Sequence, residues 1–114
     1  MSKENLVLYK KTENLFFTIY PSLKNYPKSE KFALCQQIKE HFVELLKYIS
    51  LANSVKSKRK VYAQEADGYL QNLKILFKLS KIQKYINRNF YENIQESLSE
   101  INAILVGYIK STNK

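Results

Sequence analysis

Side chains suited to nucleophilic or acid–base chemistry are few in this 114-residue chain, which has one cysteine and one histidine. Six positions separate Cys35 from His41, so on a helix the two point about 120° apart and form no dyad. Cys35 follows the apolar spacing of its segment, which predicts a small core residue. We interpret His41 as a surface or boundary residue, and a lone histidine excludes a two-histidine metal motif.

The carboxylates also lack the arrangement of an acid–base pair. Glu65 and Asp67 lie two positions apart, which places them on different faces of a helix. Three glutamates form a row on the outer face of the last segment at i, i+4, i+8 spacing: Glu92, Glu96 and Glu100. The row could hold a cation, but a solvated face or a partner for lysines is the preferred interpretation. The two glycines cannot build a Gly-rich phosphate loop. We therefore expect no catalytic residue, no metal and no cofactor, and hence no enzyme.

The charge balance is the strongest chemical signal. Nineteen Lys and Arg oppose ten Asp and Glu, for a net charge of +9 and a pI near 9.6. Residues 56–91 alone hold nine basic and two acidic side chains. A local excess of this kind favours a polyanionic partner, namely nucleic acid, an anionic membrane or an acidic protein; the alternative is charge kept for solubility.

The basic residues of this region also have a direction. At 100° per residue, five of them fall within an arc of about 120° on the third helical segment: Lys74, Lys78, Lys81, Lys84 and Arg88. No acid interrupts this stripe, which predicts a row of phosphate contacts rather than a solvated outer face. A second cluster at the start of the same segment would add reach: Lys58, Arg59 and Lys60, preceded by Lys56.

Apolar residues at three- and four-residue spacing predict four helices, at about 4–24, 28–54, 58–86 and 90–111. Short connections between them favour a single-domain, all-α, antiparallel up-down-up-down four-helix bundle. Pro21 should kink or weaken the last turn of the first helix. Pro27 and Ser29 mark the start of the second helix, and Asn89, with Glu92 three residues on, is the expected N-cap of the fourth.

The third segment is the least regular of the four. Its predicted inner face runs along one side and includes Val61, Tyr69, Leu73, Ile75, Leu76, Leu79, Ile82 and Ile86. The basic stripe would then point away from the core. Leu70 and Phe77 fall beside it, either as exposed apolar residues that mark contact with another subunit or as residues half-covered by neighbouring side chains. Gly68 costs about 1 kcal/mol in a helix interior, which a close helix–helix approach would justify.

The remaining features concern location. No apolar N-terminal leader and no run of about 18 apolar residues occurs, so we expect a cytoplasmic protein without a membrane partner.

Several short motifs, in order and spacing, give the chain a family resemblance over about residues 8–111. They are Tyr26-Pro27-Lys28, Leu34-Cys35-Gln36-Gln37-Ile38, Glu65-Ala66-Asp67-Gly68-Tyr69-Leu70, Leu73-Lys74-Ile75-Leu76-Phe77-Lys78-Leu79, Glu100-Ile101-Asn102 and Gly107-Tyr108-Ile109-Lys110-Ser111. In these motifs the chain resembles the accessory variability determinant (Avd) proteins of diversity-generating retroelements. It is also similar to the four-helix proteins encoded in ribosomal RNA intervening sequences.

The resemblance implies a basic four-helix bundle that assembles as a pentameric barrel. It further implies binding to a reverse transcriptase and to template RNA, cDNA or their hybrid, in support of mutagenic retrohoming. Lys74 and Lys78 match basic positions of the family pattern. The chain departs from that pattern at Cys35, Gln37, Asn102 and Val106-Gly107-Tyr108, where the family has glycine, a basic residue, glycine and Gly-Gly-Trp.

Two other functions remain open on the residues alone. One is a protein-interaction module whose basic surface fits an acidic protein. The other is a four-helix protein of the intervening-sequence type that has no reverse transcriptase partner.

Overall fold

The computed structural model describes residues 2–112, which fold into four α-helices. The helices are α1 (Lys3–Ile19), α2 (Leu34–Ser54), α3 (Arg59–Ile82) and α4 (Arg88–Ser111). Three short 3₁₀ helices lie in the connections: η1 (Tyr20–Asn25), η2 (Lys28–Glu30) and η3 (Lys56–Lys58). No strand occurs in the described part of the chain, so the all-α prediction is confirmed.

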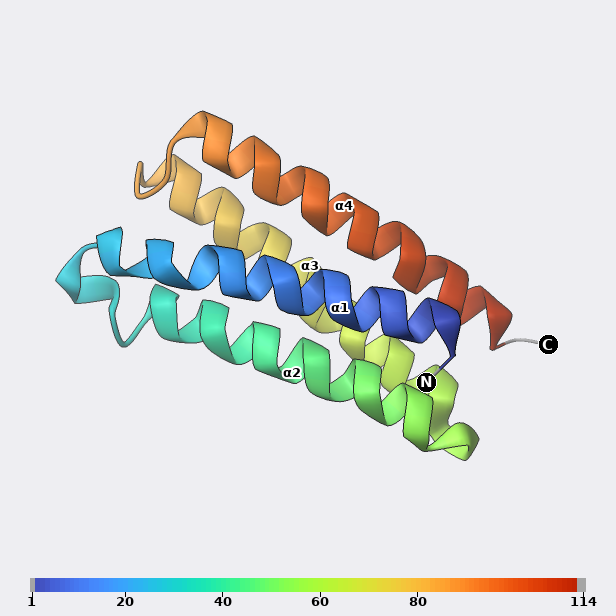
Figure 1. Cartoon of the computed structure of the whole chain (residues 1–114). Helices are drawn as coiled ribbons and strands as arrows, with labels where there is room; N and C mark the ends of the chain where they lie inside the picture. Colours follow the sequence, from blue (N-terminus) through green and yellow to red (C-terminus); the bar gives the residue numbers. More distant parts are fainter. Residues whose placement is uncertain (1, 113–114) are drawn as a thin grey trace.

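Each helix packs against the next in the sequence, and α1 and α4 close the ring (Figure 1). Neighbouring helices run antiparallel, as the short connections predict. The connection from α1 to α2 and the turn from α3 to α4 therefore lie at one end of the bundle. The α2–α3 connection and both chain termini lie at the other end, and the molecule measures 45 × 25 × 19 Å.

Aromatic rings form the centre of the core. Phe42 of α2 is fully buried and stacks on Phe16 of α1, with 5.0 Å between the ring centroids. On its other side, Phe42 lies 6.3 Å from the ring of Phe77 of α3. Three helices thus meet at one side chain, and Ile38 and Leu45, one turn to either side of Phe42 on α2, are also fully buried.

The first connection differs from the prediction, because the two prolines divide it into 3₁₀ turns. Pro21 lies at the start of η1, where its missing N–H ends the α-helical ladder at Ile19 rather than near residue 24. Pro27 precedes η2, and α2 begins only at Leu34, so the predicted start at residue 28 is wrong. Ser29 does not cap α2.

Tyr26 anchors this connection to the bundle. Its ring is buried, and its hydroxyl donates a hydrogen bond of 2.8 Å to the buried Ser80 Oγ on α3. Burial raises the pKa of this phenol above its ordinary value, although the Ser80 bond acts in the opposite direction. The connection is therefore fixed to α3 rather than hanging free.

The α3–α4 connection begins earlier and is longer than the sequence predicts, with residues 83–87 in place of 87–89. α3 ends at Ile82 instead of continuing to residue 86, and Lys84 adopts a left-handed backbone conformation with φ 63°. Asn87, not Asn89, caps α4: its side-chain oxygen accepts a hydrogen bond of 2.7 Å from the Phe90 N–H. Glu92 consequently forms no capping box and pairs instead with Arg88 at 3.0 Å.

Replacing the observed cap tests this turn. Asn87→Ala should lower the free energy of unfolding by about 1 kcal/mol, because it leaves a first-turn N–H without its partner. Asn89→Ala, at the position that the sequence favoured, is the matched control and should change stability by less than about 0.5 kcal/mol. Urea unfolding of both variants measures the difference; equal losses would contradict the assignment.

Candidate nucleic-acid interface

The orientation of α3 decides which of its side chains a partner can reach. Its buried residues include two members of the predicted inner face, Leu73 and Leu76, but the others were not predicted there: Ala63, Ala66, Leu70, Phe77 and Ser80. Leu70 and Phe77, expected beside the stripe as exposed residues, are both 0% exposed. Conversely, Ile75 is 63% and Ile82 is 62% exposed, and Val61 and Leu79 are exposed in part. The predicted inner face is therefore wrong at these four positions and confirmed at Leu73, Leu76 and Ile86.

The error has a physical cause. α3 carries large apolar residues around most of its circumference, so spacing alone does not select the side that packs. The two alanines that lie in the core carry a weak hydropathic signal, so they do not mark the packed side in the sequence. Only the tertiary fold distinguishes the two apolar sides.

An outer apolar face is therefore left on α3. We define this outer face by Val61, Gly68, Ile75, Leu79 and Ile82, all exposed. A Cβ added to Gly68 would meet nothing within 4 Å, so the close approach expected for this glycine does not occur within the chain. Exposed polar residues, Gln64, Glu65 and Asn72, lie between Val61, Gly68 and Ile75, so the continuous apolar part of this face consists of Ile75, Leu79 and Ile82.

The predicted basic stripe is retained in part, as a row along the boundary between α3 and α4. Residues 71, 74, 78 and 81 share one side of α3 at three- and four-residue spacing. Both ends of this side contact α4: the Gln71 amide donates to Asn102 Oδ1 at 3.0 Å, and the Lys81 amine lies 4.9 Å from the Tyr91 ring centroid. We call Lys74, Lys78 and Lys81 the lysine row.

The lysine row carries charge that no carboxylate offsets directly. None of its three members forms an ion pair within residues 2–112. The acidic row of α4 is exposed, as predicted, but lies on the opposite side of that helix, because Glu100 pairs with Lys11 of α1 at 3.3 Å. The positive potential along the α3–α4 boundary therefore remains available to an anion.

The end of the predicted stripe is less regular. Lys84 is exposed but belongs to the turn, so it does not continue the helical row. Arg88 opens α4 and already has a partner, since its Nε–H donates to Glu92. This ion pair is exposed, so solvent and a phosphate compete with it readily.

The second predicted cluster is remote from the lysine row and loses one member. Lys60 and Lys81 are separated by about 30 Å along α3 at 1.5 Å per residue. Lys58 and Lys60 are exposed, whereas Arg59 is half-buried. Its Nε–H donates to Ala52 O at 2.8 Å and its Nη2–H to Asn53 O at 2.9 Å, so Arg59 closes the last turn of α2.

His41 and Cys35 occupy ordinary structural positions, as predicted. Cys35 is buried, and burial raises the pKa of its thiol, against which Lys39 acts, so the thiol stays protonated at neutral pH. His41 is half-buried, with Nδ1 2.7 Å from Gln37 O and Nε2 3.3 Å from the Asn72 amide. Within residues 2–112 no three His, Cys, Asp or Glu side chains gather as metal ligands do.

Another group of lysines gathers where the sequence indicated nothing. The η1–η2 connection and the first part of α2 enclose a pocket whose lining includes Lys24, Lys28, Lys31 and Lys39. These residues lie on either side of the Tyr26-Pro27 break, so no helical periodicity relates them. Their proximity results from the folded connection and had no signal in the sequence.

None of the helices within residues 2–112 is long and apolar enough to cross a membrane.

The fold and surface define a small basic four-helix protein with one cationic row and one uncovered apolar face. Residues 6–112 match the model of the bAvd-like family, and the chain belongs to that family. The resemblance to Avd proteins is thereby confirmed. No curated protein matches the sequence.

A solved structure has the same fold. It is a protein of unknown function from the S23 ribosomal protein family of Bacteroides thetaiotaomicron, with a TM-score of 0.82 and 22% identity. The match covers 94% of this chain and 98% of that chain, so the four-helix architecture extends over both.

Arg59 provides a test of structural against binding roles. Arg59→Gln should lower the free energy of unfolding by about 1 to 3 kcal/mol, because two charge-assisted hydrogen bonds to α2 carbonyls are lost. Lys60→Gln, at the adjacent exposed position, should change it by less than about 0.5 kcal/mol. Thermal or urea unfolding compares them, and equal stabilities would show that the Arg59 contacts contribute nothing.

Proposed function

We propose that the protein is a non-enzymatic accessory factor of a diversity-generating retroelement, which binds nucleic acid and a reverse transcriptase in support of mutagenic retrohoming. Membership of the bAvd-like family supports the biological setting. The observation that carries the proposal is the lysine row, which lies unpaired along the α3–α4 boundary beside an uncovered apolar face on the same helix.

The lysine row suits the backbone of a nucleic acid better than its bases. From residue 74 to residue 81 it extends about 10 Å, a length that holds about three charges of one strand at 3.4 Å each. Lysine amines bind phosphates as point charges and read no sequence. In this proposal Lys84 and Arg88 extend the contact at the turn, and Lys58 and Lys60 contact a second part of the same strand. Template RNA, cDNA and their hybrid all present this backbone.

Salt dependence tests the phosphate contacts. If the lysine row neutralises three phosphates, it should contribute about −2.1 to −2.7 to the slope of log affinity against log salt, which is a loss of affinity of roughly 20- to 40-fold between 50 and 200 mM salt. Changing all three lysines to glutamine should remove this contribution and leave the smaller slope due to the other basic residues. Fluorescence anisotropy with a short labelled RNA or DNA measures both quantities.

A matched variant separates site from net charge. Lys3, Lys10 and Lys110 are exposed and lie outside both basic clusters, so replacing these three by glutamine removes the same charge. For this control variant, the slope of log affinity against log salt should differ by less than about 1 from that of the unmodified protein. An affinity that does not respond to salt, or equal losses in the two triple variants, would overturn the phosphate model.

We further propose that the protein is a homo-oligomer, a pentamer as in the Avd family, joined through the outer face of α3. Exposed Ile75 and Ile82 would be covered in such an assembly, which would also explain why α3 is apolar on two sides. Gly68 lies on this outer face with open space around it, which suits a close approach by a helix of another subunit.

Two glycine variants test this interface. Gly68→Ala should stabilise the isolated bundle by about 0.5 to 1 kcal/mol, because glycine is the poorer helix former and no atom obstructs the methyl group. The same methyl group should weaken assembly, which light scattering coupled to size exclusion detects as a lower mass. Gly107→Ala on α4 is the matched control, since a Cβ there is equally unobstructed. It should raise the free energy of unfolding by a similar amount and leave the mass of the assembly unchanged. If Gly68→Ala leaves the assembly intact, this face is not the interface.

The main alternative is a module that binds an acidic protein. It is favoured by the same mixture of lysines and exposed Ile75 and Leu79, because apolar contact beside charge is typical of protein interfaces. In that case glutamine substitutions in the lysine row would weaken protein binding, and RNA and DNA would not compete.

A further inference from the structure

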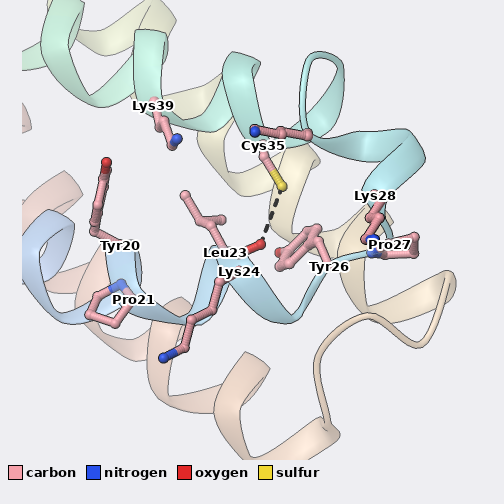
Figure 2. A pocket seen from close by; sticks show the side chains of 10 residues that line it. Tyr20, Pro21, Leu23, Lys24, Tyr26, Pro27, Lys28, Cys35 and Lys39 are labelled. Carbon is pink, nitrogen blue, oxygen red and sulfur yellow. Dashed lines mark hydrogen bonds between the residues drawn. The ribbon is translucent and has the colours of Figure 1, made fainter.

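A pocket of about 390 Å³ lies between the η1–η2 connection and the start of α2, away from the lysine row. Figure 2 shows Leu23 pointing into it, with Tyr20 and Pro21 at one end and Pro27 and Lys28 at the other. Cys35 closes one wall, where its thiol donates to Leu23 O at 3.6 Å. The connection that forms this pocket is held in place by the Tyr26–Ser80 hydrogen bond, so the cavity is preformed.

The lining combines an apolar interior with positive charge. Tyr20, Tyr26, Leu23 and two prolines supply flat or rigid apolar surfaces, and four lysines contribute to the lining, whereas no carboxylate does. The four are Lys24, Lys28, Lys31 and Lys39, and none forms an ion pair within residues 2–112. The Lys39 amine is already held 5.1 Å from the Tyr20 ring centroid, which fixes one cation beside an aromatic surface. The ligand that fits this combination is small, flat and anionic.

We propose that this pocket binds one nucleotide, with the base against Tyr20 and the two prolines and the phosphate among the lysines. Its volume is at the lower end of small-ligand pockets, which admits a single unpaired unit and excludes a duplex. Base–aromatic stacking together with a cationic rim is the usual means of holding single-stranded nucleotides. The site is separate from the lysine row of α3 and does not depend on the function proposed above.

An adjoining groove indicates where a second base would lie. Phe16 and Phe17 of α1 line a further apolar hollow that shares Tyr20 and Pro21 with the pocket. Phe17 is 62% exposed, so its ring is available for stacking. The nucleotide therefore has two possible sources, a free nucleotide or the phosphorylated end of a strand, and the groove makes a dinucleotide the probe that separates them.

Titration calorimetry with ADP, adenosine and pyrophosphate tests the site. The double variant Lys28→Gln/Lys31→Gln should weaken ADP binding about tenfold or more, whereas Lys3→Gln/Lys10→Gln should leave it within about twofold. Tyr20→Leu should weaken ADP about tenfold but leave pyrophosphate unchanged, because only the base loses its stacking surface. All five substituted positions are exposed, so none of the variants removes a core residue. Circular dichroism verifies that each variant folds.

The outcomes separate this proposal from the preceding one. Lys74→Gln/Lys78→Gln should weaken long strands yet keep ADP affinity; if ADP affinity falls equally in that variant, the pocket is not the site. Absence of ADP binding, or pyrophosphate binding as tightly as ADP, would overturn the proposal. A 5′-phosphorylated dinucleotide that binds more tightly than ADP assigns the pocket to strand ends, provided that Phe17→Ser removes the gain in affinity. Equal affinities of the dinucleotide and ADP assign the pocket to free nucleotides. Either result supports the pocket as a nucleotide site.

Discussion

The organisation of this protein depends on one constraint: α3 has more apolar surface than a four-helix bundle can bury. Phe77 and Leu70 pack in the core together with Ala63 and Ala66, and this packing turns Ile75 and Ile82 outward. The polar side of the helix then has one place left, along the boundary with α4, where Gln71 and Lys81 contact that helix. The position of the lysine row and the exposure of the apolar face therefore have the same cause.

This arrangement relates charge to assembly. In the proposed assembly, α3 would contact another subunit through its apolar face and an anion through the neighbouring lysine row. The acidic side chains of α4 do not neutralise the row, because Glu100 is turned toward Lys11 of α1. A second cationic surface lies at the end of the bundle where α1 is joined to α2. There the connection brings four lysines together around a pocket that also contains its two prolines. The two surfaces differ in shape: one is an open row and the other is a concave site.

The sequence predicted four helices and their antiparallel order, since the periodicity of α1, α2 and α4 leaves little choice of face. It was less informative wherever a local signal had two solutions. Asn87 and Asn89 are both good caps, and only the connection after Ile82 selects the first. Arg59 belongs to a run of basic residues, yet its contacts with α2 carbonyls exist only in the folded chain. The pocket lysines lie on both sides of a proline break, so their meeting required tertiary structure.

The most direct test of the central claim is a footprint of lysine reactivity. The protein is acetylated at low salt, alone and with a short RNA, and the extent of modification at each lysine is read by mass spectrometry. The account predicts that RNA protects Lys74, Lys78 and Lys81 while Lys3 and Lys10 react as before. Uniform protection of all lysines, or none along the α3–α4 boundary, would contradict it.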